Sequence, residues 1–297
     1  MGTRDATHFF ILGKDYHLGD LLWFTAVLAA YRRHARPARV RIACPDRPIS
    51  RILERHPLID DLLLYGEDGH LPRAARSGDV VVVHDLRPLP IALSMLREWR
   101  YRCPWLYLRD LWLDERGQWL ATFLRLGRLR DVRPVLRLDE DDRVTARSLP
   151  VPYVVLAPHT GHYALPLLGL FWRRVKGWRE AGWGDVAEAL RAAGYEPITL
   201  AAAGQAPIPG TRALTGLPIR RVAGVIEGAA ALVSVESGLW YIAAALGRPF
   251  IIVPWWLPRS IDWTASMGVR RRLIYRDQAS IRYVLSQVRD LLAQDAV

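Results

Sequence analysis

The stretch that decides the fold is Ala231-Leu-Val-Ser-Val-Glu-Ser-Gly-Leu-Trp-Tyr-Ile-Ala-Ala-Ala-Leu-Gly-Arg-Pro-Phe-Ile-Ile-Val253. Its hydropathy pattern predicts two short apolar strands, over 231–235 and 250–253, and a helix over 239–246 between them. Gly247 is suited to end that helix, because glycine readily adopts the left-handed conformation found there. Two strands joined by a helix pair in parallel, so this stretch predicts a parallel α/β sheet.

The turn between the first strand and the helix has features that suit a phosphate ligand. Ser237 is a good helix cap, since its hydroxyl accepts a hydrogen bond from a free amide of the first turn. Gly238 lets a ligand approach the backbone, and free amide groups at such a turn attract phosphate. Glu236 lies where its carboxylate could hold a ribose hydroxyl. The alternative is an ordinary strand–helix–strand unit with a capped helix, and this stretch alone leaves both open.

Outward from this stretch, the chain keeps alternating apolar strands with helices. The other predicted strands are 8–12, 40–43, 60–65, 79–84, 153–157, 197–201 and 273–275. The other predicted helices are 21–33, 49–55, 91–99, 118–126, 184–193, 221–227 and 280–292. Strands separated by helices imply doubly wound parallel sheets, which bind ligands at the carboxyl ends of their strands.

A chain of 297 residues is too long for one ordinary core and fits two domains of about 150 residues each. The boundary is predicted where the charged run Asp139-Glu-Asp-Asp142 is followed by Leu149-Pro-Val-Pro152. We therefore expect domains 1–148 and 149–297, two Rossmann-like halves facing a central cleft that holds the site.

The formal charge of +11 favours anionic partners such as sugar nucleotides, phosphorylated glycolipids or a membrane surface. Nucleic acid is a further anionic partner, but a weaker candidate, because the arginines are scattered and no nucleic-acid-binding module accompanies them. Cys44 and Cys103 lie far apart and have no metal-ligand spacing, which favours a reducing compartment. The sequence has neither a signal-peptide pattern nor a membrane-spanning apolar run, so a cytoplasmic location is expected.

Lys14 and Lys176 are the only lysines in a chain that otherwise uses arginine. A lysine kept in such a chain indicates a position that needs a compact ammonium group, and a diphosphate is the obvious ligand. Chance placement remains the alternative for both residues.

Three further signals each have a structural and a functional interpretation. Asp20, at the start of a predicted helix, is either a helix cap or a general base in the cleft. The acidic pair Asp139 and Asp141 matches a metal–diphosphate pattern, but a solvated linker is favoured because no buried strand precedes it. His159-Thr160-Gly161 follows a strand and is either a turn or a phosphate contact. The apolar run in 161–171 is either an acceptor-side lip or a packed insertion.

Four motifs together resemble glycosyltransferase family 9, the heptosyltransferases of bacterial lipopolysaccharide synthesis. They are Gly19-Asp20, His159-Thr160-Gly161, Lys176-Gly-Trp178 and Ser234-Val-Glu-Ser-Gly-Leu-Trp-Tyr-Ile-Ala-Ala-Ala-Leu-Gly-Arg-Pro249. The resemblance implies the GT-B fold, with an acceptor-binding N-terminal domain and a nucleotide-sugar-binding C-terminal domain. It also implies an inverting transfer of a sugar, typically from ADP-heptose, to a lipid-linked acceptor.

The resemblance further implies a role for each residue of the motifs. Asp20 would be the base that deprotonates the acceptor hydroxyl. Lys176, Thr160 and the amides at Ser237 and Gly238 would hold the diphosphate, so neither a metal nor another cofactor is required. Glu236 would stand near the nucleotide. The other expected donor or cleft residues are Tyr241, Lys14, Gly19 and His159.

The chain departs from the family at two of these positions. The family usually has Asp-Ser/Thr-Gly followed by a His three residues after the glycine, whereas this chain has Glu236 and Tyr241. Tyrosine donates a hydrogen bond but has no positive charge at neutral pH. The donor sugar and base are therefore open. A catalytically silent nucleotide-sugar-binding or assembly protein is the alternative function.

Overall fold

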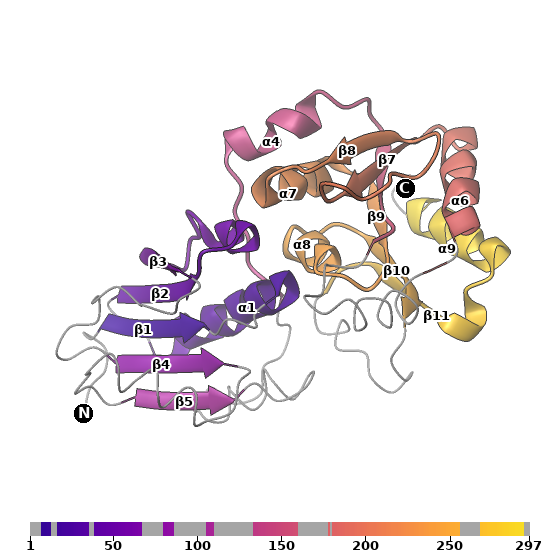
Figure 1. Cartoon of the computed structure of the whole chain (residues 1–297). Coiled ribbons are helices and arrows are strands. Elements are labelled where there is room, and N and C mark those ends of the chain that lie inside the picture. The colour runs from indigo at the N-terminus through magenta and orange to yellow at the C-terminus, as the bar shows by residue number, and fades with distance from the viewer. Residues whose placement is uncertain are drawn as a thin grey trace. The chain divides into compact units, whose positions relative to one another are not determined.

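The computed structural model describes residues 7–12, 17–35, 39–66, 80–85, 105–109, 133–159, 178, 180–255 and 268–293. The chain divides into two compact units, Met1–Arg137 and Leu138–Val297 (Figure 1). The division lies before the boundary expected at 148, because helix α4 (Glu140–Arg147) packs on helix α7 (Ile219–Gly228) of the second unit.

The first unit has a five-stranded parallel sheet in the order β3-β2-β1-β4-β5. The strands are β1 (Thr7–Leu12), β2 (Arg39–Pro45), β3 (Asp61–Tyr65), β4 (Val80–Asp85) and β5 (Trp105–Arg109). The helical elements are α1 (Leu18–Ala35) and the short 3-10 helix η1 (Pro48–Leu53). The first four strands were predicted and β5 was not. The helices predicted over 91–99 and 118–126 lie outside the described residues.

Consecutive side chains of β1 are buried, which shows that both faces of this sheet are covered. Phe9 and Phe10 point to opposite faces and are both fully buried. Phe10 meets Phe24 of α1 edge to face, with ring centroids 5.6 Å apart. Helix α1 therefore packs on the face of β1 that carries Phe10.

The second unit has a six-stranded parallel sheet in the order β11-β10-β9-β6-β7-β8. The strands are β6 (Tyr153–Ala157), β7 (Glu196–Ala201), β8 (Arg212–Thr215), β9 (Ala231–Ser234), β10 (Phe250–Trp255) and β11 (Arg271–Tyr275). Besides α4 and α7, the helical elements are α6 (Glu180–Ala192), α8 (Leu239–Ala245), the 3-10 helix η3 (Arg276–Gln278) and α9 (Ile281–Ala293). Numbered within the unit, the strands run 3-2-1-4-5-6, the Rossmann order.

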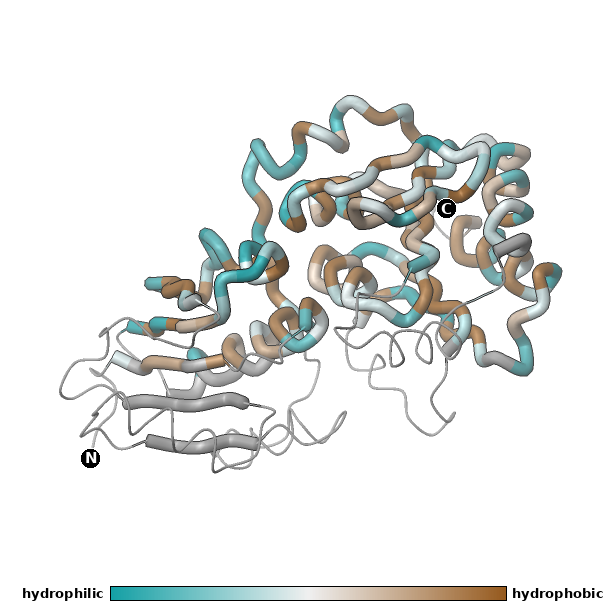
Figure 2. Tube along the Cα trace, in the orientation of Figure 1, coloured by the Kyte–Doolittle hydropathy of each residue, from teal (hydrophilic) through white to brown (hydrophobic). Residues whose placement is uncertain are grey.

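Buried apolar residues of the sheet and of α6 and α9 form the core of the second unit. Along α6 and α9 the chain alternates between hydrophobic and hydrophilic residues, as amphipathic helices do (Figure 2). Strand β8 was not predicted, because its four residues are half-exposed or exposed and form no apolar run.

Glycines end two helices of this unit, and Gly247 was predicted to do so from the sequence. Gly247 (φ 72°) donates to Ala244 O, and Arg248 N donates to Ala243 O at 2.8 Å. These two bonds form a Schellman motif after α8. The same pair of bonds follows α6, where Gly194 has φ 83°. Both helices therefore stop at a glycine in the left-handed conformation.

The acidic run before α4 is not a solvated linker throughout. Asp139 caps the helix and forms a capping box with Asp142. Asp142 is 4% exposed and accepts from Arg220 of α7 at both carboxylate oxygens, from Nε at 3.1 Å and from Nη2 at 2.6 Å. Glu140 and Asp141 are exposed, as expected. The linker prediction was wrong for Asp139 and Asp142, because each is bound into the α4–α7 contact.

Candidate functional site

The strand order of the second unit reverses between β6 and β9, and the predicted donor residues follow these two strands. Ala157 and Ser234, the last residues of the strands, are register partners. The amide of Val235 donates to Ala157 O at 3.1 Å, so the two loops leave the sheet side by side. His159 lies in the first loop and Glu236 in the second. Open parallel sheets bind ligands at this kind of position.

In the turn after β9, Ser237 lies one residue before the cap position of α8, but its hydroxyl accepts from an amide of the first turn, as predicted. The cap position is Gly238, which has helical φ and ψ of −65° and −14° and makes no side-chain cap bond. The Ser237 hydroxyl lies 3.4 Å from Ser234 Oγ and accepts from Leu239 N at 3.4 Å. Both contacts are at the long end of the hydrogen-bond range, so they hold the hydroxyl weakly. Ser234 is fully buried and donates to Val235 O, a role that the sequence did not reveal.

Glu236 and Tyr241, the two departures from the family pattern, are both partly exposed beside this turn. The Tyr241 ring stacks on Trp240, with centroids 3.7 Å apart and planes inclined by 26°. Trp240 is fully buried and lies 5.6 Å from the Phe250 ring. The buried Trp240 therefore fixes the direction in which Tyr241 leaves the helix.

The His159 side chain binds a neighbouring loop. This contact fits the interpretation of His159 as part of a turn. Its Nε2 lies 2.7 Å from Ala206 O, in the loop that follows β7. Because a carbonyl only accepts hydrogen bonds, Nε2 carries the proton in this contact. His159 thus holds the loop after β7 against the loop after β6.

Thr160, Lys176 and Lys14 lie outside the described residues, as does the apolar run in 161–171. Trp178, two residues beyond Lys176, is described. Its indole nitrogen donates to Ala279 O at 3.0 Å, and its ring meets Trp183 edge to face at 5.3 Å. A Cβ on Gly182 would lie 2.8 Å from the Trp178 ring. The tryptophan next to the predicted diphosphate lysine is therefore an anchor, which the sequence did not assign.

In the first unit, Asp20 lies in the first turn of the helix that follows β1, next to that sheet's own switch point between β1 and β4. Helix α1 begins at Leu18, three residues before the predicted start. His17 N donates to Asp20 Oδ2 at 2.9 Å, and this bond closes the first turn. Asp20 and Gly19 are both partly exposed. Asp20 is the third residue of α1 and therefore not its N-cap, but its side chain binds the backbone at the helix start and stays partly exposed.

The acidic residues of the described part of the chain form no group that resembles a metal site. Within those residues, no three or more His, Cys, Asp or Glu side chains gather closely enough to hold an ion. Asp139 caps α4, so its carboxylate already binds the start of the helix. This contact does not support the metal–diphosphate interpretation of Asp139 and Asp141.

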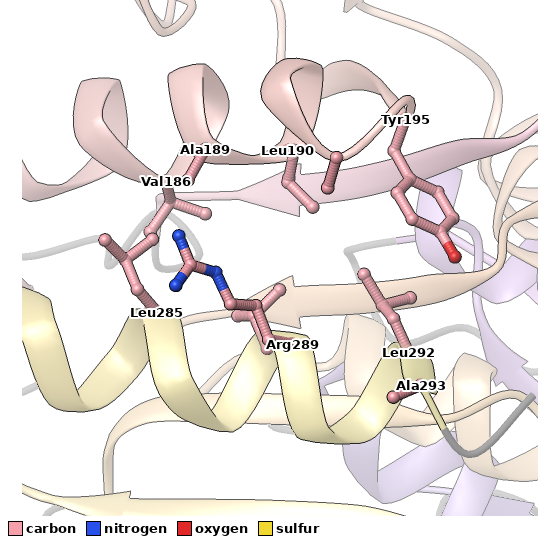
Figure 3. Close-up of a pocket in the computed structure, with 10 residues that line it drawn as sticks. Val186, Ala189, Leu190, Tyr195, Leu285, Arg289, Leu292 and Ala293 are labelled. Carbon is pink, nitrogen blue, oxygen red and sulfur yellow. The ribbon is translucent and has the colours of Figure 1, made fainter.

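An apolar groove of about 210 Å³ lies between α6 and α9 (Figure 3). Its walls include Val186, Leu190 and Leu292, and the Arg289 side chain rises from α9 toward α6. No predicted site residue lines this groove. The helices of the described residues include none that could cross a membrane.

Comparisons with known proteins point to one family. The model of Glycosyltransferase family 9 (heptosyltransferase) matches residues 129–253, which contain the turn after β9. The solved ADP-heptose lipopolysaccharide heptosyltransferase II of E. coli has a TM-score of 0.72 at 17% identity, covering 98% of this chain and 100% of its own. The glycosyl transferase family 9 protein of Veillonella parvula DSM 2008 has a TM-score of 0.71 at 15% identity, covering 98% and 99%.

E. coli heptosyltransferase WaaC, solved with ADP, has a TM-score of 0.66 at 15% identity, covering 96% of this chain and 99% of its own. No curated protein matches the sequence. The fold likeness extends over nearly the whole chain, and the family pattern covers the segment that contains the proposed donor turn. The resemblance predicted from the motifs is thus confirmed: residues 129–253 match the glycosyltransferase family 9 (heptosyltransferase) model, the chain has a GT-B fold, and these matches indicate a glycosyltransferase.

Proposed function

We propose that this enzyme transfers a sugar, heptose or a similar one, from a nucleotide diphosphate to a cell-surface glycan or glycolipid. The transfer inverts the anomeric centre and uses no metal, and an ADP-sugar is the favoured donor. The acceptor belongs to lipopolysaccharide synthesis or a related surface glycan. The observation that carries the proposal is the register pairing of Ala157 with Ser234, which starts the two proposed donor loops side by side.

The second unit would bind the donor through the residues that follow β6 and β9. Ser237 Oγ, with its two long contacts, is available to the diphosphate. Gly238 adds no side chain at the turn, so phosphate oxygens can approach its amide. Lys176 and Thr160 would complete the diphosphate site. The charge that develops on the leaving diphosphate would then be neutralised by an ammonium group and oriented donors, the kind of stabilisation that lowers a barrier most.

Glu236 and Tyr241 would face the nucleoside and sugar side of the donor. The Glu236 carboxylate would accept hydrogen bonds from ribose hydroxyls. Tyr241 would donate one through its phenol, at a position fixed by stacking on Trp240. Lys14, Gly19 and His159 would shape the surroundings of the reacting groups.

The first unit would supply the base. The Asp20 carboxylate takes the proton of the acceptor hydroxyl while that oxygen forms its bond to the anomeric carbon. The bond from that carbon to the diphosphate oxygen breaks on the opposite side, which inverts the centre. The bond from His17 N to Asp20 Oδ2 holds the carboxylate in place, as a general base requires.

The partners follow from the charge of the protein. A formal charge of +11 suits an anionic glycolipid acceptor and the anionic inner face of a membrane, to which the enzyme would bind peripherally from the cytoplasm. We propose no nucleic-acid partner.

A thermal-shift panel tests the donor assignment, since a ligand that binds only the folded state raises its melting temperature. The panel holds ADP, GDP, UDP, CMP and their sugar conjugates. A shift with one diphosphate and its sugar, followed by transfer to a lipopolysaccharide precursor, supports the proposal. No shift with any of them overturns it.

A catalytically silent nucleotide-sugar-binding or assembly protein is the second candidate function, and Glu236 and Tyr241 are the residues that favour it. It predicts a clear shift with a nucleotide sugar and neither transfer to any acceptor nor hydrolysis of the donor.

A further inference from the structure

The chain passes between its two units once, at Arg137–Leu138. Buried polar side chains bind the backbone on both sides of this crossing, and these side chains belong to neither proposed substrate site. There are two such sets of hydrogen bonds, called holds below, and each is formed within one unit.

In the first unit, the backbone of Val135 is held by Thr25 and His56. Val135 N donates to Thr25 Oγ1 at 2.8 Å, and His56 Nε2 donates to Val135 O at 2.8 Å. The His56 ring has its proton on Nε2, because Nδ1 accepts from Leu58 N at 3.2 Å. Thr25 and His56 are 0% and 3% exposed, so water does not readily replace these bonds.

In the second unit, Asp139 and Asp142 are held by Arg220. Asp142 Oδ2 accepts from Asp139 N at 2.8 Å and from Arg220 Nη2 at 2.6 Å. A Cβ on Gly224 would lie 2.1 Å from Asp142 O, so the backbones of α4 and α7 are in contact. Helix α4, which follows the crossing, is therefore part of the second unit and moves with it.

The two holds leave only residues 136–138 between Val135 and Asp139. Helix α1 carries both Thr25 and Asp20, so the first hold ties the linker to the helix that bears the proposed base. A change of orientation between the units would then be confined to the φ and ψ angles of three residues, the kind of short hinge that domain motions use.

We propose that Thr25 and His56, together with Arg220, are positioning residues that restrict the pivot between the units to residues 136–138. They would limit how freely the two units turn about this crossing. The expected effect on sugar transfer rests on the proposed function. The restriction of the pivot itself rests only on the contacts around Val135 and Asp142.

The test is a distance measurement between spin labels on Arg33→Cys in α1 and Glu188→Cys in α6, both exposed positions. Cys103→Ser removes one native thiol, and Cys44 is buried. The full-length protein is measured with and without ADP by electron double resonance. Thr25→Val removes the acceptor for Val135 N, and Thr25→Ser keeps it. Thr199→Val is the matched control, because Thr199 is equally buried and its hydroxyl is also hydrogen-bonded, to Thr211, but it lies in the second unit.

The expected result is a wider distance distribution in Thr25→Val than in the parent, with the parent width restored in Thr25→Ser and unchanged in Thr199→Val. The affinity for ADP stays the same in all three variants, while kcat falls in Thr25→Val. A parent-like distribution in a folded Thr25→Val overturns the inference. If no nucleotide binds and no sugar is transferred, the proposed function fails, but the width comparison without ADP still decides the pivot.

Discussion

Arg220 and Asp142 form a two-point ion pair between α7 and α4, with donor–acceptor distances of 3.1 and 2.6 Å. Both side chains are 6% exposed. A buried pair of this kind contributes little over an apolar replacement, but removing one partner leaves a charge without compensation. The pair therefore makes a sharp prediction about the stability of the second unit.

We predict that Arg220→Met lowers the free energy of unfolding by about 3–5 kcal/mol, because Asp142 keeps its charge in a buried site. Urea unfolding followed by circular dichroism measures the loss. The double variant Arg220→Met/Asp142→Asn recovers part of it, since asparagine is neutral and still accepts from Asp139 N. A double variant as unstable as the single one would contradict the explanation.

Arg143→Met is the control for this prediction. Arg143 binds Glu227 across the same pair of helices at 2.6 and 2.9 Å, but its side chain is 32% exposed. Exposed pairs are worth at most about 1 kcal/mol, so Arg143→Met has a much smaller effect than Arg220→Met.

For the base, we predict that Asp20→Asn and Asp20→Ala both lower kcat by about 10²–10⁴-fold, because neither side chain can take the acceptor proton. The two variants differ in stability. Asparagine still accepts from His17 N, whereas alanine loses about 1 kcal/mol of helix-start stabilisation. The measurements are initial rates of transfer and thermal melts.

Asp290→Asn, at an exposed position of α9, is the matched control and keeps full activity. Nucleotide binding stays intact in both Asp20 variants, since the donor residues belong to the other unit. Undiminished turnover in Asp20→Asn would remove Asp20 from the role of base.

The sequence predicted those parts of the fold that depend on local signals. Gly247 and Gly194 mark helix ends, because the left-handed conformation that each adopts disfavours other residues. The start of α1 was predicted three residues too late. His17 N donates to Asp20 Oδ2, so Asp20 binds the backbone three residues before it and lies inside the helix, not at its cap. Helix α4 was missed because the burial of Asp142 depends on Arg220, 78 residues away.

The candidate site was predictable to the same extent. The order of the chain places Glu236 after a strand and Asp20 after another, which is local information. That the strands before His159 and Glu236 are neighbours depends on the pairing of β6 with β9, and periodicity does not reveal pairing. The anchoring of Trp178 by Ala279 likewise joins residues 101 positions apart.

The donor preference is expected to follow Glu236 and Tyr241. We predict that Glu236→Asp/Tyr241→His, which restores the usual family pattern, changes the ranking of nucleotides in the thermal-shift panel toward ADP. Each tenfold gain in affinity corresponds to about 1.4 kcal/mol of added stability at saturating ligand. Tyr283→His, at an exposed position of α9, controls for the added histidine. An unchanged ranking would mean that these residues do not select the donor.

Two glycines in helices make a matched pair for packing. A Cβ on Gly224 would lie 2.1 Å from Asp142 O, whereas a Cβ on Gly184 would have nothing within 4 Å. We predict that Gly224→Ala destabilises the protein by about 1–3 kcal/mol through overpacking. Gly184→Ala stabilises it by up to about 1 kcal/mol through helix propensity. Denaturant unfolding measures both, and a Gly224→Ala variant as stable as the parent would show that α4 can move off α7.

Alkaline pH tests the burial of Cys44 at the end of β2. Burial raises the pKa of the Cys44 thiol to about 12, against about 8.5 in an unfolded chain. Between these values the unfolded thiol loses its proton and the folded one keeps it, so the unfolded state binds fewer protons and stability falls as pH rises. The contribution of the buried thiol to the free energy of unfolding is fully present below about pH 8.5 and declines by up to about 1.4 kcal/mol per pH unit above it.

The variant Cys44→Ala lacks the thiol, so this decline is absent from it. The stability difference between the parent and Cys44→Ala, measured by urea unfolding, therefore shrinks from pH 8 to pH 11. Tyr153, whose pKa burial also raises to about 12, is present in both proteins and cancels in the difference. A constant difference over this range would show that the thiol ionises as easily in the folded protein as in the unfolded chain.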